Sequence, residues 1–445
     1  MIKKQFSKFI LVFLKTLAKL QLKKIKPLII GVGGSSGKSS LSSLISIILA
    51  SRYKVHFNEG MNSETGIPLN ILGIKMRSYN IFDWIKVLLL APFCLLFNWK
   101  RYRFYVAEMG IDGPLEPKNM TYLQKIINPT IGVLTNISYE HSQYFDKLAM
   151  GKDAETRKEK LLKLTADQEL LLLKKLPKNG TAFLNIDDEK IKHAIEDIKA
   201  NRISVSKKDK NADFYINNTK YTLEKFTIDF VNEKHKYSIT VPTLLPVHYA
   251  KTIVFAIAIA KTCGVSINDS IKIIKDNFSL PPGRMSVFNG IKNTKIIDSS
   301  YNNATLPPIL DILEMLKTVG KNQRRIAILG DMRELGSFSK EAHEILADKL
   351  LNTVDFTILI GPLMKRYASP VLQKNKFKHK WFLNFTEAKN SILGEVKNGD
   401  LILVKSSQNT LYLERVVEML LKNPQDRNKL CRRGKFWNRK RNLTP

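Results

Sequence analysis

The chain has 445 residues, of which 44% are hydrophobic, and its formal charge at pH 7 is +32. This length predicts two or three domains, and this hydrophobic content excludes a disordered chain. The 3 cysteines lie far apart in the sequence, which excludes a disulfide framework or a zinc cluster and favours a reducing cytoplasm. No nucleic-acid-binding motif accompanies the scattered lysines, so we expect no nucleic-acid partner.

Residues 1–26 are predicted to form a basic amphipathic helix. Its apolar core, residues 9–14, is too short to span a membrane, and no small-residue cleavage site follows it, so we expect no cleaved signal peptide. The helix either lies on an anionic membrane or packs against the body of the protein, and the sequence leaves both possibilities open. Its apolar stripe consists of Phe6, Phe9, Ile10, Phe13, Leu17 and Leu20.

A glycine-rich loop follows at residues 31–41, which read Gly-Val-Gly-Gly-Ser-Ser-Gly-Lys-Ser-Ser-Leu. The apolar residues 27–30 before it are typical of a buried strand, and residues 41–50 after it have helical spacing. In such a loop the glycines let backbone N–H groups converge on phosphate oxygens. We therefore predict that Lys38 binds phosphate and that the Ser39 hydroxyl holds a Mg²⁺ ion that bridges the phosphates.

The next stretch combines a polar loop with an unusually apolar segment. Residues 53–57 suggest a second strand, and the loop after it carries Asn62 and Ser63, which we expect to face the nucleotide pocket. Residues 84–103 follow, and their uncharged part, residues 87–99, is shorter than the roughly 20 residues that a membrane span requires. With Pro92 in its middle, this segment is predicted to be a buried or interfacial helical hairpin.

Polar residues end the next two predicted strands. Residues 104–109 form a strand that ends near Glu108, and residues 129–136 form one that ends in Asn136, with His141 five residues beyond. The carboxyl ends of parallel strands are where open α/β sheets bind ligands, and Mg²⁺ prefers oxygen ligands. We therefore predict a metal role for Glu108 and a metal or phosphate role for His141. A helix over residues 150–164 and strands over 181–185 and 203–205 are predicted next.

The sequence Pro-Pro-Gly-Arg at residues 281–284 predicts a domain boundary. Strands over 295–298, 325–329, 356–360 and 401–405 and helices over 309–318, 340–351 and 411–421 are predicted beyond it. Their alternation predicts an α/β fold class, in which the phosphate-loop domain has a mostly parallel sheet and the C-terminal domain is a Rossmann-like α/β domain. The basic tail is expected to be exposed or loosely docked. The predicted segments are residues 1–26, 27–280 with the apolar insertion 84–103, 281–425 and the tail 426–445.

In this order the motifs resemble those of the Mur ligases, the ATP-dependent amide-forming enzymes of peptidoglycan precursor synthesis. The likeness extends from residue 27 to about residue 420 and is greatest to the branch that adds D-alanyl-D-alanine. Residues 329–336, Leu-Gly-Asp-Met-Arg-Glu-Leu-Gly, point most specifically to that branch. The other matching features are the spacing of the phosphate loop and residues 62–69, 107–110, 128–141, 184–188, 282–284 and 297–302.

The resemblance implies a peptide ligase that joins D-Ala-D-Ala to a UDP-linked muramoyl tripeptide through an acyl phosphate. The two substrates are the expected partners of a monomer, and ATP and Mg²⁺ are the expected cofactors. A carbamylated lysine is expected to help organise the metal, because a carbamate is an anionic oxygen ligand whereas a free lysine is a cation. Lys158 matches the family position, with Lys152 and Lys160 as alternatives.

The resemblance also assigns roles to individual residues. Arg284 is expected to reach the ATP phosphates when the C-terminal domain closes. The expected catalytic residues are Lys38, His141, Lys158 and Arg284, and the expected metal ligands are Ser39, Glu108 and His141. The expected ATP-binding residues are Gly34, Ser35, Ser36, Gly37, Lys38, Ser39, Ser40, Asn136, Asp298, Tyr301 and Asn302. The expected substrate-binding residues are Asn62, Ser63, Asp331, Glu334 and Lys405.

In the family that the chain resembles, a first domain that binds the UDP-sugar end of the acceptor precedes the phosphate loop. In this sequence about thirty residues precede the loop. We expect segments 1–26 and 84–103 to pack together, and either to form a reduced substrate platform or to hold a cytoplasmic enzyme at the inner membrane. Two other functions stay open. One is a Mur-like ligase of the poly-γ-glutamate or folylpolyglutamate type, and the other is an inactive, membrane-associated nucleotide-binding protein.

Overall fold

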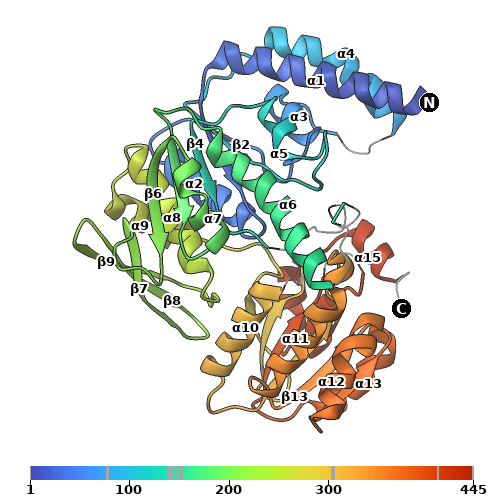
Figure 1. Ribbon diagram of the computed structural model, residues 1–445. Helices are drawn as coiled ribbons and strands as arrows, with labels where there is room; N and C mark the ends of the chain where they lie inside the picture. Colours follow the sequence, from blue (N-terminus) through green and yellow to red (C-terminus); the bar gives the residue numbers. More distant parts are fainter. Residues whose placement is uncertain are drawn as a thin grey trace. The chain divides into compact units, whose positions relative to one another are not determined.

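The structure, a computed structural model, describes residues 2–76, 80–138, 145, 148–149, 154–301, 306–407 and 410–442 (Figure 1). Contacts within the chain divide it into two compact units. The first unit comprises residues 1–218, 229–239 and 250–278, and the second comprises residues 219–228, 240–249 and 279–445. Two β-sheets with helices packed against them form these units, which confirms the predicted α/β fold class.

The first sheet has nine strands within the described residues and is mostly parallel. Its strand β1 lies between β3 and β4 and is parallel to both. Every residue of β3 and β4 is buried, which fits their apolar sequences, with Glu108 at the end of β3 as the exception. In sheet order the strands are β2 (Val55–Phe57), β3 (Phe104–Glu108), β1 (Leu28–Gly33), β4 (Ile131–Leu134), β5 (Thr181–Asn185), β6 (Asn201–Ser206), β7 (Phe214–Tyr221), β8 (Phe226–Asn232) and β9 (His235–Val241).

Helices pack on this sheet next to the strands that carry the predicted site. Helix α2 contacts β1, β2 and β3, and α6 contacts β4 and β1. The apolar residues of α2 recur at helical spacing and are buried, as the sequence predicts. The helices are α1 (Ile2–Ile25), α2 (Lys38–Ala50), α3 (Gly66–Leu72), α4 (Ile81–Phe97), α5 (Met120–Gln124), α6 (Ala154–Lys174), α7 (Glu189–His193), α8 (Tyr249–Thr262) and α9 (Ile267–Asn277), with the 3₁₀ turn η2 (Ile195–Asp197).

Strands β7, β8 and β9 lie in a stretch where the sequence reading predicts no strand. Burial alternates strictly along β8, where Phe226, Ile228 and Phe230 point inward. This period of two is a strand signal. The surrounding sequence is rich in Asn and Lys, which are uncommon in strands, and this composition hides the alternation.

Helix α1 packs against the body of the first unit. Its residues Ile10 and Leu14 form a buried cluster with Leu69 and Leu72 near α3 and with Val87 of α4. The sequence leaves two possibilities open for residues 1–26, and the structure shows one of them, packing against the body of the protein. The expectation that segments 1–26 and 84–103 pack together is also met, because α1 contacts α4 directly.

The predicted helical hairpin at residues 84–103 is wrong. Helix α4 continues through Pro92, and Asn80 caps its start by accepting a hydrogen bond from the Asp83 backbone N–H. The buried face continues across the proline from Val87 and Ala91 to the partly buried Leu95, so packing against α1 outweighs the backbone hydrogen bond that Pro92 removes. Among the described helices, none is long and apolar enough to cross a bilayer.

The second sheet has six strands within the described residues. All neighbouring pairs are parallel except β10 and β11, which are antiparallel at one edge. In sheet order the strands are β10 (Ser286–Asn289), β11 (Lys295–Ser299), β15 (Leu401–Lys405), β12 (Arg325–Gly330), β13 (Phe356–Ile360) and β14 (His379–Phe382). The helices are α10 (Leu306–Val319), α11 (Ser339–Leu351), α12 (Ser369–Lys374), α13 (Phe385–Glu395), α14 (Glu414–Leu420) and α15 (Lys435–Asn442), with the shorter turns η3 (Gly336–Phe338), η4 (Met364–Ala368) and η5 (Pro424–Lys429).

The tail is docked on the second unit, so the expectation of an exposed or loose tail is wrong. Leu430, Cys431 and Arg432 are at most 5% exposed, and Arg441 of α15 is 7% exposed. Arg432 pairs with Glu414, and Arg441 pairs with Glu418. The basic residues that suggest a solvated tail in the sequence instead pair with acidic residues on α14, which are 18 and 23 residues earlier in the chain.

Candidate functional site

The glycine-rich loop joins β1, an interior strand of the first sheet, to α2. It therefore lies where the chain leaves a parallel strand flanked by β3 and β4, the usual ligand position in an open parallel sheet. Gly34 has a φ of 109°, and a Cβ atom there would lie 2.3 Å from Thr135 Oγ1. Gly37, which precedes α2, has a φ of 81°. Only glycine fits at position 34, and glycine is favoured at position 37.

Neighbouring elements hold the first N–H groups of this loop. The Gly34 N–H donates to Glu169 Oε2 at 2.9 Å. The Ser35 N–H donates to the Asn136 carbonyl at 2.8 Å, and the Ser36 N–H donates to Asn136 Oδ1 at 3.1 Å. These bonds fix the path of the loop. Asn136, expected to bind ATP, thus lies against the loop and positions it.

The start of α2 is the position best suited to bind phosphate. The Leu41 N–H donates to the Gly37 carbonyl at 3.0 Å, which leaves the earlier N–H groups of the helix without acceptors inside the helix. Such a helix start attracts anions through these N–H groups and through the helix dipole. Of the residues there, Lys38 is half-buried and Ser39 is exposed. Lys38 Nζ donates to the carbonyls of Gly34 and Ser35 at 2.6 and 3.1 Å, which keeps the ammonium over the loop.

A second layer of polar side chains supports Thr135 and Asn136. Asn185 Nδ2 donates to the Thr135 carbonyl at 2.7 Å, and Asp188 Oδ2 accepts from the Ile137 N–H at 2.7 Å. Lys251 connects this layer to α8, with its Nζ 2.9 Å from Asn185 Oδ1 and 2.7 Å from Asp187 Oδ2. Burial acts to raise the pKa of Asp187, but hydrogen bonds from Lys251, Ser206 and Lys207 outweigh it and lower that pKa. Asp187 therefore stays ionised as the partner of Lys251.

Glu108 ends β3 next to β1, as the sequence predicts. The residue is 3% exposed, and its Oε1 accepts a hydrogen bond from Asn62 Nδ2 at 2.8 Å. Its backbone is held by Asn58, which accepts from the Glu108 N–H at 2.7 Å and donates to the Glu108 carbonyl at 2.9 Å. The structure therefore brings together Asn62 and Glu108, which are 46 residues apart in the chain.

The donor set at this sheet edge fits Mg²⁺. No lysine or arginine of the described residues forms an ion pair with the buried Glu108 carboxylate, so a cation there would compensate its charge. No group of three or more His, Cys, Asp or Glu side chains capable of holding a metal occurs in the described part of the chain. Mg²⁺ usually takes one or two protein ligands and completes its shell with phosphates and water. Glu108 and the Ser39 hydroxyl are the two candidates.

The other predicted residues of the first unit lie as follows. Ser63 Oγ accepts from the Gly66 N–H at 3.1 Å and so supports the start of α3. Lys158 is half-buried on α6, whereas Lys160 is exposed on the same helix. His141 and Lys152 lie outside the described residues.

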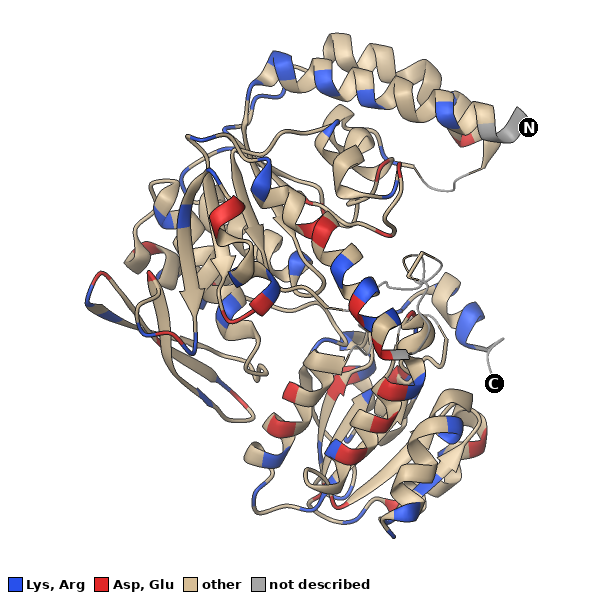
Figure 2. Cartoon of the chain, viewed as in Figure 1, with Lys and Arg blue, Asp and Glu red and all other residues tan. Residues whose placement is uncertain are grey.

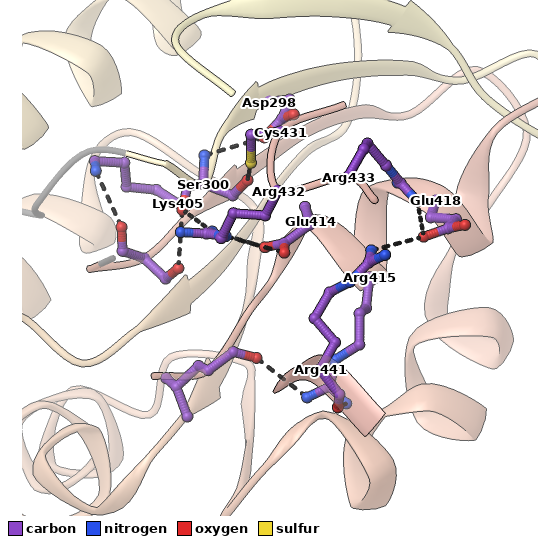
Figure 3. A network of polar contacts seen from close by, with 12 residues as sticks. Asp298, Ser300, Lys405, Glu414, Arg415, Glu418, Cys431, Arg432, Arg433 and Arg441 are labelled. Carbon is purple, nitrogen blue, oxygen red and sulfur yellow. Dashed lines mark hydrogen bonds and ion pairs between the residues drawn. The ribbon is translucent and has the colours of Figure 1, made fainter. Parts of the chain in front are cut away.

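In the second unit, Asp298 lies at the end of β11 and is fully buried. Its Oδ1 accepts from the Ser300 N–H at 3.0 Å, and its Oδ2 has no donor among the described residues. Burial raises the pKa of Asp298 to about 6, and the nearby Glu414 also raises it. Figure 3 shows Asp298 near Ser300, Cys431 and Arg432. The guanidinium groups of Arg284 and Arg432 each lie 5.4 Å from the centre of the Tyr301 ring, and Asn302 lies outside the described residues.

The three predicted substrate residues of the second unit follow neighbouring strands. Asp331 follows β12, and its Oδ1 accepts from the Met364 N–H at 2.9 Å. Burial raises its pKa, while the N–H groups of Met364 and Leu363 counteract that rise. Lys405 ends β15, is 2% exposed and donates to the Ser406 carbonyl at 3.2 Å. Glu334 is exposed and has a φ of 64°. Asp331 and Lys405 thus lie at the carboxyl edge shared by two adjacent parallel strands.

His343 supports the loop that contains Glu334. Its Nε2 accepts from the Met332 N–H at 3.2 Å, and its Nδ1–H donates to the Ser339 carbonyl. This pair of bonds requires the neutral imidazole with its proton on Nδ1. Burial lowers the pKa of His343, which favours the same form.

Three residues that contact the predicted site residues, or the polar layer that supports them, are not singled out by the sequence. Glu169 holds the Gly34 N–H, Lys251 supports Asn185, and Arg432 lies beside Tyr301. Glu169 could have been noticed in the sequence, because an acidic residue stands there on the apolar face of a helix, among Ala166, Leu170 and Leu173. Lys251 and Arg432 have no comparable signal in a chain with so many basic residues.

Comparison with protein families gives two matches that together span most of the chain. The family described as "Mur ligase middle domain" matches residues 32–260, and the family described as "Mur ligase, glutamate ligase domain" matches residues 283–408. The UDP-N-acetylmuramoyl-tripeptide--D-alanyl-D-alanine ligase of Bacillus subtilis is 24% identical over 423 residues, which cover 92% of this chain and 79% of that protein. The protein of the same name from Buchnera aphidicola subsp. Baizongia pistaciae is 26% identical over 403 residues, which cover 88% and 75%.

Solved structures share this fold. MurF from Acinetobacter baumannii superimposes with a TM-score of 0.73 at 19% identity, covering 93% of this chain and 81% of that one. MurF ligase from Thermotoga maritima in complex with ADP gives a TM-score of 0.71 at 24% identity, covering 94% and 84%.

Proposed function

This chain belongs to the Mur ligase family of ATP-dependent acid–amino-acid ligases, and we propose that it joins D-alanyl-D-alanine to a UDP-linked muramoyl tripeptide. One observation carries the choice of substrates. The curated relatives that match 92% and 88% of this chain act, by their names, on this tripeptide and this dipeptide. The motif at residues 329–336, which leads from β12 past Asp331, supports the same branch.

In the proposed first step, a carboxylate oxygen of the acceptor attacks the γ-phosphorus of ATP. The bond to the β,γ-bridging oxygen breaks, and the products are an acyl phosphate and ADP. The N–H groups at the start of α2 and the Lys38 ammonium hold the phosphates during this transfer. Ser39 and Glu108 are the proposed ligands of Mg²⁺, which neutralises charge on phosphate oxygens when bound. His141 is retained as a proposed ligand from the sequence.

In the proposed second step, the amine of D-Ala-D-Ala attacks the acyl carbon and inorganic phosphate leaves. The attacking nitrogen loses a proton, and an amide bond results. Asp331, Glu334 and Lys405 are the proposed contacts of the dipeptide, and Asn62 and Ser63 those of the acceptor. Arg284, Asp298, Tyr301 and Asn302 are proposed to contribute to nucleotide binding. Both steps gather negative charge, so positioning and electrostatic stabilisation are expected to provide most of the rate enhancement.

Lys158 is the proposed carbamylated lysine. It is half-buried on α6, the helix that also provides Glu169 beside the phosphate loop. Lys158→Arg keeps the positive charge but cannot form the carbamate, so we expect it to abolish activity. The matched change Lys160→Arg, at an exposed position on the same helix, is expected to leave activity unchanged. Full activity of Lys158→Arg would remove this residue from the proposal.

The test of the function is a phosphate-release assay on the full chain with ATP and Mg²⁺. D-Ala-D-Ala and UDP-linked muramoyl tripeptide are added singly and together, and L-glutamate replaces the dipeptide in a parallel reaction. Release that requires both proposed substrates, and that the Lys38→Ala variant lacks, is the expected result. Release that requires L-glutamate in place of the dipeptide would overturn the proposed substrate. Equal release by Lys38→Ala would overturn the proposed ATP site.

A further inference from the structure

One face of α4 is apolar and uncovered. Phe82, Ile85, Leu89, Phe93 and Leu96 follow one another at helical spacing, and all are exposed. Phe82 and Phe97 are 76% and 74% exposed. Most of the large hydrophobic side chains that are exposed among the described residues lie on α1, on α4 or at Trp99. We call the exposed side of α1, α4 and residues 98–103 the α1–α4 surface.

The helix that carries this exposed face is packed closely against α1. The opposite side of α4 is buried, with Val87 and Ala91 at 2% and 0% exposure against α1. Lys24 of α1 donates to the Leu95 carbonyl at 2.8 Å, and Gln21 donates to the Asn98 carbonyl at 2.8 Å. These bonds hold α4 in one orientation. The apolar side chains on its outer face are therefore presented by a fixed support, as at a binding surface.

The α1–α4 surface is also strongly basic. Residues 2–26 and 80–103 contain twelve lysines and arginines against one acidic residue, Asp83. Figure 2 shows basic residues along α1 beside an α4 that is almost free of charge. Lys100 and Arg101 are exposed just beyond α4, and Trp99 is 63% exposed with Lys24 Nζ 3.6 Å from its ring centre. Aromatic side chains bordered by basic ones are typical of the boundary between lipid tails and headgroups.

We propose that the α1–α4 surface docks on an anionic lipid bilayer. The apolar face of α4 enters the headgroup region, and the lysines and arginines around it contact lipid phosphates. A second copy of the chain fits less well, because two such surfaces would bring like charges together. This inference is independent of the proposed substrates.

The test is flotation of the full chain with vesicles of 70% phosphatidylcholine and 30% phosphatidylglycerol, and with pure phosphatidylcholine vesicles. We expect binding to the anionic vesicles that weakens at high salt, and at least tenfold weaker binding to the neutral ones. Phe82→Glu with Phe93→Glu should lower vesicle binding at least tenfold without unfolding, because both side chains are exposed. Phe436→Glu, an exposed aromatic on α15, is the matched control and should bind normally.

Two readouts make the test decisive. The fluorescence of the exposed tryptophan should shift to the blue on anionic vesicles and not in a Trp99→Phe variant. Equal vesicle binding by wild type and the Phe82→Glu, Phe93→Glu variant would overturn the proposal. The proposal would also be overturned if light scattering showed that the wild type is a dimer and that this variant is a monomer. A second copy of the chain would then cover the surface.

A separate observation concerns a pocket of about 500 Å³ in the second unit, between α14 and the tail. Four arginines and one acidic residue are among its lining residues: Arg415, Arg427, Arg433, Arg441 and Glu418. Glu418 Oε2 is shared, at 3.0 Å from Arg433 Nη1 and 3.3 Å from Arg441 Nη1, as Figure 3 shows. Among the lining residues, one carboxylate faces four guanidinium cations.

Several donors in this arginine pocket lack acceptors. Among the described residues, Arg433 Nε and Nη2 and Arg441 Nε are buried without a hydrogen-bond partner. Buried N–H donors of charged groups are costly to leave unpaired. Guanidinium groups bind phosphate oxygens in pairs of parallel hydrogen bonds. We infer that the arginine pocket binds an oxyanion with at least two negative charges, of the phosphate or diphosphate class.

The probes are inorganic pyrophosphate and UDP, and each is titrated calorimetrically into the full chain that carries Lys38→Ala. This substitution removes the lysine of the phosphate loop, so that the titration measures binding elsewhere. We expect one of them to bind and Arg427→Ala or Arg433→Ala to weaken that binding at least tenfold. Arg427 is exposed, so its removal should not unfold the protein. Lys429→Ala, an exposed cation two residues away that pairs with Asp426, is the matched control. Tighter binding of UDP than of pyrophosphate would identify a nucleotide diphosphate. No binding of either probe, or binding that both arginine variants retain, would overturn the inference.

Discussion

Arg432 forms a bidentate ion pair with Glu414, with distances of 3.0 Å from Nε to Oε1 and 2.7 Å from Nη2 to Oε2. The two side chains are 1% and 0% exposed. Burial acts to lower the pKa of Arg432, but the hydrogen bonds and charge of Glu414 outweigh it and raise that pKa. Arg432 also donates to the Ser300 carbonyl at 3.0 Å. The pair thereby fastens the tail to the residues that follow β11.

We expect Glu414→Gln to destabilise the second unit by about 3–5 kcal/mol, because Arg432 then remains as a buried charge that has lost its bidentate partner. Urea unfolding followed by circular dichroism measures this change in the free energy of unfolding. Lys429→Ala, at an exposed position, should change it by less than about 0.5 kcal/mol. A loss below about 1 kcal/mol for Glu414→Gln would mean that the tail is not held by this pair.

Gly34→Ala is expected to weaken ATP binding at least tenfold. The new Cβ would meet Thr135 Oγ1 at 2.3 Å and the Asn136 carbonyl O at 2.9 Å, so the loop must move away from β4. Gly60→Ala is the matched control, since Gly60 also has a positive φ of 68° but a Cβ there meets nothing within 4 Å. Calorimetric titration with ATP measures the affinity. Equal affinities of the two variants would contradict a specific role for the Gly34 contact.

Glu108→Gln is expected to raise the Mg²⁺ concentration required for half-maximal activity. The amide oxygen of Gln can still accept from Asn62, so the fold should persist while the negative charge is lost. Activity measured against Mg²⁺ at fixed ATP gives the required concentration. Glu116→Gln, which removes an exposed carboxylate paired with Lys125, should leave it unchanged. If Glu108→Gln has the wild-type Mg²⁺ dependence, Glu108 is not a ligand.

His343 should make the second unit less stable in mild acid. Its pKa is lowered in the folded state by burial, so the unfolded chain takes up the proton first as the pH falls below 6.5. Its contribution to stability is therefore complete above pH 6.5 and declines below it, because protonated His343 cannot accept from the Met332 N–H.

The comparison with His343→Gln isolates this effect, since Gln offers a donor and an acceptor but does not titrate. The stability advantage of wild type should shrink as the pH falls from 7 to 5, in urea unfolding at each pH. Asp298, whose pKa burial raises to about 6, titrates in both proteins and cancels in the comparison. The Tyr367 ring, whose centre lies 6.0 Å from the centre of the His343 ring, is present in both proteins. A constant difference between the two proteins would contradict the lowered pKa of His343. His193→Gln, which changes an exposed histidine, is the control variant.

The local parts of the candidate site could be predicted from the sequence. The glycine spacing and the following lysine predict a phosphate loop between β1 and α2, because backbone freedom and helix-start chemistry depend on neighbouring residues. The strand ends at Glu108 and Asn136 were also within reach, because parallel strands present their carboxyl ends at one edge. The bond between Asn62 and Glu108 was not predictable, since 46 residues separate them in the chain.

Segments 84–103 and 426–445 show where local reasoning fails. Pro92 suggests a break, yet α4 continues because its buried face packs on α1. The basic tail suggests solvation, yet Arg432 and Arg441 are buried by acidic partners on α14. In both cases the deciding partner lies outside the segment itself, on α1 for the helix α4 and on α14 for the tail.

The sequence by itself determined the fold class and the chemistry of the phosphate loop, because both depend on short-range spacing and composition, and the order of its motifs carried the resemblance to the Mur ligase family. Only the tertiary structure decided that Glu169 and Asn136 hold that loop, that α1 covers one face of α4 and leaves the other exposed, and that the tail docks. The physical reason is that burial and ion pairing are properties of surfaces, and a surface exists only after distant segments have packed together.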